Sequence, residues 1–251
     1  MQILEAVGLG IVQGLTEFIP VSSSGHLILF ENFFGLDAQK LLGFDIIVHA
    51  GTLLALTVLF WHKLIGILKG DWKLLAQLVI ATIPATILGL LYKDFLEENL
   101  RSVQSVAIAF IIVGIYFLLA EKLRKQKDLS PKRTWWQVVG MGLAQAVAII
   151  PGISRSGTTV ATGTLLGLRR DSSAEFSFLM LMPVACGALL LVLAKGETNA
   201  LPATEICLTG FAVSAIVSFL AARFMLSFFR RFGLNYFAYY LLFLGILLVW
   251  F

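Results

Sequence analysis

Charged residues are scarce in this sequence. Of its 251 residues only 14% are Asp, Glu, Lys or Arg, against roughly 25% in soluble domains, and 59% are hydrophobic. The mean hydropathy of +0.90 excludes an ordinary soluble enzyme and predicts an integral membrane protein. At about 20 residues per span, the chain has room for roughly eight to ten membrane-embedded segments but none for a separate soluble catalytic domain.

Cysteine is also rare, which limits the kinds of site that the chain can build. Cys186 and Cys207 both lie within apolar stretches, where we expect small buried hydrophobes rather than a disulfide or a metal pair. The net charge of +4 comes from basic residues in short loops, so it reports orientation in a membrane and indicates no nucleic-acid partner. The first segment carries Glu5 and no basic residue, and we do not expect it to be a cleaved signal peptide.

Long apolar runs are the dominant feature of the chain. Those long enough to cross a bilayer cover residues 44–61, 72–92, 102–120, 172–194, 204–226 and 236–251. Residues 2–34 and 135–168 are apolar as well, but a loop rich in Gly and Ser divides each into halves too short to span. The sequence therefore predicts an all-α polytopic membrane protein with about six transmembrane helices and two re-entrant helix-loop-helix hairpins.

The basic loops predict the orientation of these segments. Residues 61–73 and the linker at about 121–134 are rich in Lys and Arg, and arginine pairs follow at 169–170 and 230–231. Loops of this kind stay in the cytoplasm. We therefore expect the second hairpin to enter the membrane from the cytoplasmic face and the first from outside, with both chain termini external.

The two halves match in sequence when one is shifted by 132 positions. The shift aligns four pairs of polar or loop residues, namely Gln13 with Gln145, Ser22 with Ser154, Ser24 with Ser156 and Gly25 with Gly157. With the opposite orientations, this predicts an inverted-topology repeat within one membrane domain, 1–251, in which repeat one covers about 1–121 and repeat two about 135–251. The same shift places Ser23 opposite Arg155, so the symmetry breaks inside the loops.

The two loops, at residues 20–26 and 151–159, form the candidate site. Helices that begin after these loops would aim free N–H groups and positive dipole ends into one cavity, which favours an anion such as phosphate. Arg155 adds a bidentate donor, and its place in an apolar region requires an anionic partner. That partner is a phosphate, the carboxylate of Glu17, or both.

Two further polar pairs lie close to the first loop. Gln13 and Glu17 are four residues apart and share one helix face, where they can hold a divalent cation or a proton, or simply contact another helix. His26 is the best candidate for a general acid or base, although a structural hydrogen bond explains it equally well. Asp45 and His49 form a weaker pair, which we expect to support the site or to lie near a metal.

The motifs of the two loops resemble those of a known family. The runs QGLTEFIPVSSSGH at 13–26 and PGISRSGTT at 151–159 are similar to the signatures of the bacitracin-resistance family of undecaprenyl-diphosphate phosphatases, and the resemblance covers essentially the whole chain. It implies a bacterial inner-membrane enzyme that hydrolyses a C55 polyprenyl diphosphate to the monophosphate carrier used in peptidoglycan synthesis. It also implies a divalent cation, Mg2+ or Ca2+, an outward-facing site, a homodimer and resistance to bacitracin.

The residues and the resemblance together give a hypothesis for the site. Ser23 attacks the terminal phosphorus, Arg155 holds the transferring oxygens, and His26 handles the proton. Glu17, with Gln13, holds the cation or helps to activate the serine, although Gln13 stands where many members of the family have Glu. The phosphate-binding set is Ser22, Ser24, Gly25, Ser154, Arg155, Ser156, Gly157 and Thr159. Helix capping alone also explains most of these serines.

Two other functions fit part of the pattern. A polyprenyl-phosphate flippase would use the same inverted hairpins to bind an anion, and fold alone does not exclude it. A membrane scaffold without chemistry would leave Glu17 and Arg155 in the membrane without a reason. We favour the phosphatase, because a flippase needs no nucleophile. Whether Ser22, Ser23 or His26 forms the covalent bond stays open.

Overall fold

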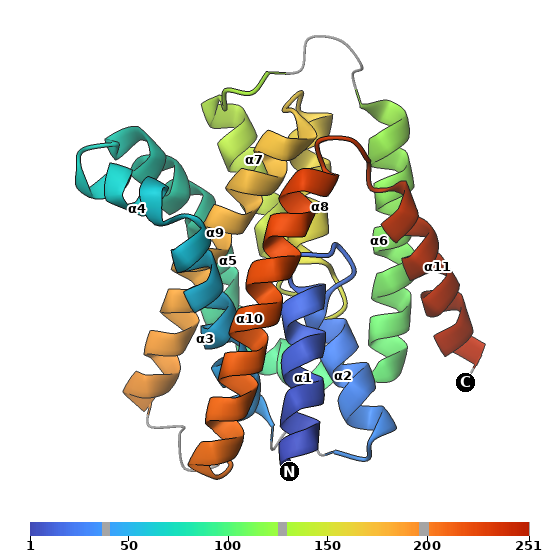
Figure 1. The fold of residues 1–251 in the computed structure, drawn as a ribbon. Helices are drawn as coiled ribbons and strands as arrows, with labels where there is room; N and C mark the ends of the chain where they lie inside the picture. The colour runs from blue at the N-terminus through green and yellow to red at the C-terminus, as the bar shows by residue number, and fades with distance from the viewer. Residues whose placement is uncertain (37–40, 125–129, 196–200, 251) are drawn as a thin grey trace.

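The computed structural model describes residues 1–36, 41–124, 130–195 and 201–250, so the middle of the predicted basic linker, 125–129, lies outside it. The described chain is built of α-helices (Figure 1). The first half contains α1 (Ile3–Thr16), α2 (Ser23–Phe33), α3 (Leu42–Leu59), α4 (Trp61–Leu68), α5 (Trp72–Leu100) and α6 (Val103–Leu123). The second half contains α7 (Trp135–Val147), α8 (Arg155–Leu165), α9 (Arg170–Lys195), α10 (Thr204–Phe228) and α11 (Asn235–Trp250). The predicted all-α class is confirmed.

Both broken hairpins are present. The helices α1 and α2 form the first, and α7 and α8 form the second. They enter from opposite ends of the molecule, and their loops meet near its middle (Figure 1). The four half-helices contain 14, 11, 13 and 11 residues. At about 1.5 Å per residue, none of them alone crosses a hydrocarbon core of about 30 Å.

The number of full spans is lower than predicted. Among the described residues, four helices are long and apolar enough to cross a membrane: α5, α6, α9 and α10. A fifth candidate is α3 with α4, which bend by 74° at their junction. With only 16 residues, α11 is shorter than a typical span. The helices are those of a multi-pass membrane protein, but the expected count of six is not confirmed.

Each hairpin packs against a long helix from the other half. The helix α1 lies along α10, and α7 lies along α5. Small residues allow this close approach: a Cβ added at Gly14 would lie 2.8 Å from Val217 Cβ, and one at Gly142 would lie 2.8 Å from the carbonyl oxygen of Ala81. The reciprocal packing is that expected of two halves with inverted orientation.

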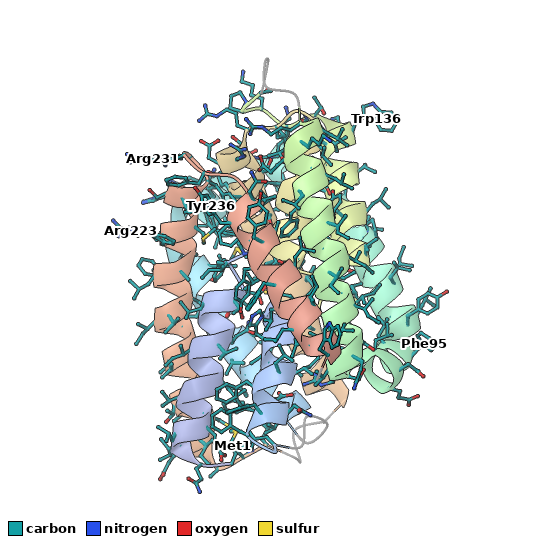
Figure 2. All side chains as sticks on the ribbon, turned by 90° about the vertical axis from the view of Figure 1, so that its right-hand side faces the viewer. Met1, Phe95, Trp136, Arg223, Arg231 and Tyr236 are labelled. Atoms are coloured by element: carbon teal, nitrogen blue, oxygen red, sulfur yellow. The ribbon has the colours of Figure 1, made fainter. Side chains whose placement is uncertain are left out.

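The outer surface is apolar along the helices and basic at one end. Large side chains such as Phe95 and Trp136 project outward (Figure 2) and are 57% and 84% exposed, as side chains that face lipid do. The helix α4, the start of α7 and the turn between α8 and α9 lie at the same end of the molecule (Figure 1). These are the segments whose Lys and Arg residues predict a cytoplasmic location.

Candidate active site

The same capping arrangement begins both helices that leave the loops. The Gly25 N–H donates to Ser22 Oγ at 3.3 Å, and the Gly157 N–H donates to Ser154 Oγ at 3.2 Å. Each cap serine satisfies one N–H of the first turn and leaves others free, so both helix N-termini attract anions. The backbone of Ser22 has a φ of +73°, which residues other than glycine rarely adopt.

The two loops are in direct contact. The Gly152 N–H donates to Ser24 Oγ at 3.4 Å across the two halves. A Cβ added at Gly157 would lie 2.1 Å from Phe117 Cζ and 2.8 Å from Pro20 Cβ, so the second loop reaches the first only because this position has no side chain. The two predicted parts of the site therefore form one locus.

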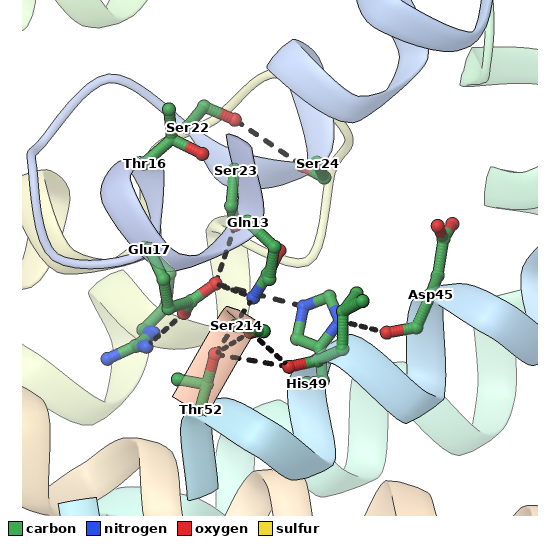
Figure 3. A network of polar contacts seen from close by, with 12 residues as sticks. Gln13, Thr16, Glu17, Ser22, Ser23, Ser24, Asp45, His49, Thr52 and Ser214 are labelled. Carbon is green, nitrogen blue, oxygen red and sulfur yellow. Dashed lines mark hydrogen bonds and ion pairs between the residues drawn. The ribbon is translucent and has the colours of Figure 1, made fainter. Parts of the chain in front are cut away.

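Glu17 lies at the centre of this locus (Figure 3) and is 6% exposed. Its Oε1 accepts a hydrogen bond from Arg155 Nη2 at 2.5 Å. Its Oε2 accepts hydrogen bonds from Ser23 Oγ at 2.6 Å and from Gln13 Nε2 at 3.0 Å. Arg155 also donates through Nη1 to the carbonyl oxygen of Ser177 at 2.9 Å. The structure thus brings together four of the predicted residues, and the Glu17–Arg155 ion pair left open by the sequence is present.

This arrangement has the components of a nucleophilic site. The hydroxyl of Ser23 lies within hydrogen-bonding distance of a carboxylate that can accept its proton. Arg155 supplies a planar set of donors beside it, and only some of these are used by Glu17 and Ser177. A phosphoryl group at this point would meet a nucleophile, a base and a positive charge.

His26, three residues after Ser23 on α2, has other partners. Its Nδ1 is 2.8 Å from the carbonyl oxygen of Ser22, and its Nε2 is 2.8 Å from the hydroxyl of Tyr240 on α11. Its ring stacks on Phe110, with the centroids 5.3 Å apart. Among the described residues, no hydrogen bond joins His26 to the Glu17 carboxylate. A role for His26 in the reaction stays a prediction.

His49, by contrast, lies beside the centre of the site. Its Nδ1 donates to the carbonyl oxygen of Asp45 at 2.7 Å, and its Nε2 lies 3.7 Å from Glu17 Oε2 (Figure 3). The sequence indicated His49 only as a member of a weaker polar pair. Its position four residues after Asp45 was the available signal, but nothing in the sequence showed that α3 packs against α1.

A buried hydroxyl network behind Gln13 was not predicted. Thr52 Oγ1 lies 2.9 Å from Ser218 Oγ and 3.3 Å from Ser214 Oγ, and Gln13 Nε2 donates to Thr52 at 3.5 Å. Ser214 and Ser218 are four residues apart on α10, so they share a face. That spacing was the only sequence signal for the network, which connects the first hairpin to repeat two.

The remaining predicted phosphate ligands differ in what they contact. Thr159 is fully buried, and its hydroxyl lies 2.6 Å from Ser177 Oγ, so it joins α8 to α9. Ser156 is 3% exposed, while Ser24 Oγ lies 3.3 Å from Ser22 Oγ at the loop contact. Their roles in phosphate binding stay predictions. Outside the site, Glu175 pairs with Lys63 at 2.7 Å.

A second charged cluster lies at the far end of α2. Arg101 Nη2 donates to Asp45 Oδ2 at 2.7 Å and to Glu31 Oε2 at 3.1 Å. Burial raises the pKa of Glu31 to about 8; the negative charge of Asp45 adds to this shift and Arg101 opposes it. Asp45 therefore contacts Arg101 through its side chain and His49 through its backbone, so it supports the site from outside.

The residues at the centre fit a divalent cation only in part. Among the described residues, no group of three or more His, Cys, Asp and Glu could hold a metal ion. However, Gln13 contacts Glu17 through Nε2, and its Oε1 is buried with no hydrogen-bond partner. Mg2+ commonly takes one or two carboxylates and completes its shell with water and phosphate oxygens. Glu17 and Gln13 Oε1 meet this requirement.

Comparison with known proteins agrees with the geometry. The family model described as bacitracin resistance protein BacA matches residues 6–247. The chain belongs to the BacA family. An undecaprenyl-diphosphatase of Rubrobacter xylanophilus is 42% identical, and the alignment covers 96% of this chain and 94% of that protein. Undecaprenyl-diphosphatases of Carboxydothermus hydrogenoformans and Thermodesulfovibrio yellowstonii are 41% and 39% identical, each over 98% of this chain and 96% of the relative. BacA membership confirms the family resemblance of the two loop motifs.

Proposed function

We propose that the protein hydrolyses undecaprenyl diphosphate to undecaprenyl phosphate and inorganic phosphate. The observation that carries this proposal is the 2.6 Å hydrogen bond from Ser23 to Glu17, beside Arg155, where the two loops meet. The relatives in the BacA family are named undecaprenyl-diphosphatases, which points to the same reaction. The chemistry is phosphoryl transfer, in which positioning and charge stabilisation do most of the catalytic work.

In the first step, the Ser23 oxygen attacks the terminal phosphorus and its proton passes to Glu17. The bond from that phosphorus to the bridging oxygen breaks, and undecaprenyl phosphate leaves with the electron pair. Arg155 and the free N–H groups at the starts of α2 and α8 hold the oxygens of the transferred phosphoryl group.

In the second step, water attacks the phosphoserine and inorganic phosphate leaves, while Glu17 returns a proton to the Ser23 oxygen. His26 stays a candidate for proton transfer in this step or, in a variant of the mechanism, for the nucleophile. Its Nδ1 faces a carbonyl oxygen, which can only accept, so the neutral ring keeps a lone pair on Nε2.

The proposed cation is Mg2+ or Ca2+, with Glu17 and Gln13 as its protein ligands. When bound, such a cation neutralises charge on the diphosphate and makes its terminal phosphorus easier to attack. The Oε2 atom of Glu17 would then serve both the cation and the Ser23 hydroxyl, while Oε1 accepts from Arg155.

In the cell, we propose that this reaction recycles the lipid carrier of peptidoglycan synthesis and thereby confers resistance to bacitracin. The location is the inner membrane, with the basic end of the molecule in the cytoplasm and the site open to the outside. The homodimer implied by the resemblance is part of the proposal, and light scattering of the detergent-purified protein tests it.

Phosphate release from a C55 polyprenyl diphosphate by detergent-purified protein tests the reaction. We expect release by wild type, and its loss in Ser23→Ala and Glu17→Gln. Ser227→Ala is the matched control, because Ser227 is an exposed serine on α10. Full activity in a well-folded Ser23→Ala would overturn the serine mechanism and direct the search to His26→Ala.

A flippase is the second candidate, because polar loops from two inverted hairpins meet near the middle of the molecule. Translocation of a fluorescent polyprenyl phosphate across vesicles tests it. A wild type that moves the lipid but releases no phosphate from the diphosphate would favour the flippase over the phosphatase.

A further inference from the structure

His49 presents a lone pair to the centre of the site. A backbone carbonyl can only accept a hydrogen bond, so the 2.7 Å contact from Nδ1 to the Asp45 carbonyl oxygen fixes the ring proton on Nδ1. In the neutral ring, Nε2 then has no proton and lies 3.7 Å from Glu17 Oε2. Histidines that bind metals commonly donate their other ring N–H to a backbone carbonyl or a carboxylate in this way.

A turn of the Gln13 amide would bring a third ligand atom to the same point. Its side chain is fully buried, and its Oε1 has no hydrogen-bond partner. Its Nε2 lies 3.0 Å from Glu17 Oε2, so a half-turn of the amide would bring the unpartnered oxygen to the place that the nitrogen occupies. An oxygen at that place would face the carboxylate across a short gap, which is unfavourable unless a cation lies between them.

The two distances are close to those between ligands of one ion. In an octahedral shell with bonds of about 2.1 Å, neighbouring ligands lie about 3.0 Å apart and opposite ligands about 4.2 Å apart. The place now occupied by Gln13 Nε2, 3.0 Å from Glu17 Oε2, has the spacing of a neighbouring ligand. His49 Nε2, at 3.7 Å, lies between the two spacings and would move slightly on binding. The hydroxyl of Ser23 lies 2.6 Å from the same oxygen and therefore adjoins this set of ligand atoms.

We propose that His49 is a protein ligand of the divalent cation, together with Glu17 Oε2 and Gln13 Oε1. A nitrogen ligand shifts the preference of the site from Mg2+ or Ca2+ toward first-row cations such as Co2+ and Zn2+, which accept imidazole more readily. This inference deepens the proposed function, because it assigns a third ligand and a cation class to the same site.

Binding of Co2+ alone to the detergent-purified protein tests the proposal, since visible absorption of Co2+ reports nitrogen ligation. We expect His49→Ala to weaken Co2+ binding about tenfold or more, by analogy with the scale for disturbing a metal site. Mg2+ binding, measured by competition, should change less. His62→Ala is the matched control, because His62 is an exposed histidine on α4 and should leave the spectrum unchanged.

His49→Gln provides the second test, and it keeps a side chain of similar length if His49→Ala does not fold. It should retain weak Co2+ binding through an amide oxygen but lose the absorption due to nitrogen. Equal Co2+ affinity and equal spectra for wild type and either folded variant would overturn the proposal and leave His49 and Glu17 as an ion pair.

The Co2+ titration uses no lipid substrate, so it tests the metal ligand independently of the phosphatase activity. A protein that binds Co2+ through His49 but releases no phosphate from the diphosphate would support the metal ligand and overturn the phosphatase. A protein that releases phosphate while His49→Ala binds Co2+ like wild type would overturn the ligand alone.

Discussion

The loops of the two repeats share a backbone design and differ in chemistry. In each, a serine caps a half-helix by accepting a hydrogen bond from a glycine three residues later, Gly25 in one and Gly157 in the other. The next residue after the cap is Ser23 in the first loop and Arg155 in the second, and both contact Glu17. The two helix starts therefore match in their caps, and the difference at one matched position places a hydroxyl on one side of Glu17 and a positive charge on the other.

The acid belongs to one repeat only. Glu17 lies in the first hairpin, and the shift of 132 positions matches it with Ile149 in the second. A symmetric pair of carboxylates would repel each other in an apolar environment, whereas one carboxylate between a serine and an arginine is stabilised by both. The asymmetry at positions 17 and 23 therefore makes the site possible.

Removing Arg155, the positively charged side chain of the second loop, should have the largest effect on activity and stability. We expect Arg155→Ala to lower the rate of phosphate release about 10²–10³-fold, the scale for losing one donor to a developing charge. It should also lower the free energy of unfolding by about 3–5 kcal/mol, because Glu17 is left buried without its partner. Arg223→Ala, which removes an exposed arginine on α10, is the control.

The double variant Arg155→Ala with Glu17→Gln separates these two effects. It removes both charges, so the stability measured by thermal unfolding in detergent should recover while phosphate release should not. Near-normal turnover in a folded Arg155→Ala would contradict the role of the second loop.

Glycine-to-alanine substitutions at the starts of α2 and α8 should destabilise the protein to different extents. Gly157→Ala would place a Cβ 2.1 Å from a ring carbon of Phe117, whereas Gly25→Ala would place one 2.6 Å from a ring carbon of Phe110. We expect both variants to lose about 1–3 kcal/mol of unfolding free energy, the range for overpacking, with the larger loss at Gly157. Equal thermal unfolding of both variants and wild type would show that the loops are not closely packed.

The charged cluster at the end of α2 should make stability depend on pH. The 132-residue shift matches Glu31, Asp45 and Arg101 with Gly163, Ser177 and Gly233, so repeat two has no equivalent. The pKa of Glu31, about 8, lies above the ordinary value of 4.5 for a glutamate, so folding takes up a proton between these values. Stability should therefore be fully present below about pH 4.5 and fall as the pH rises through about 8.

Thermal unfolding of wild type and Glu31→Gln between about pH 5 and 9 measures this dependence. The variant cannot titrate at this position, so its melting temperature should change less across the range. A moderate effect is expected, because Arg101 remains to balance the charge that Glu31 gains. Parallel curves for the two proteins would contradict the assignment.

Replacing the two cap serines, Ser22 and Ser154, by glycine should change the free energy of unfolding least. The two changes should differ in sign. Ser154→Gly loses a cap at ordinary backbone angles, which costs a few tenths of a kcal/mol. Ser22→Gly loses the same cap but relieves a φ of +73°, a strain of roughly 1 kcal/mol or more. We expect thermal unfolding to show slight destabilisation for the first and no loss, or a gain, for the second.

Apolar runs and broken hairpins were readable from the sequence because membrane segments are selected for length and hydropathy. The predicted run 72–92 lies within α5, which continues to Leu100 beyond the hydrophobic stretch. The bend of 74° between α3 and α4 was not predicted, because no Pro or Gly stands at the junction around Phe60. Hydropathy reports burial in lipid and says little about where a helix ends or turns.

The residues of the site were predicted less completely than the fold. Ser23, Glu17 and Arg155 meet as expected, because loop motifs carry their positions with them. The role of His26 stays a prediction, and the position of His49 beside Glu17 could not be derived from the sequence, since which side of a helix faces the site depends on its neighbours. A hydrogen bond between α3 and α10 joins residues 166 positions apart, and one sequence alone does not contain that information.

The hydrogen bond between Gly152 and Ser24, which joins residues 128 positions apart, has a consequence for biosynthesis. A ribosome delivers the first hairpin to the membrane long before it has made the second. During that interval the serines and Glu17 of the first loop lack the partners that repeat two provides, and lipid offers none. The nascent chain must therefore hold its first hairpin near water or near the insertion machinery until residues 151–159 arrive.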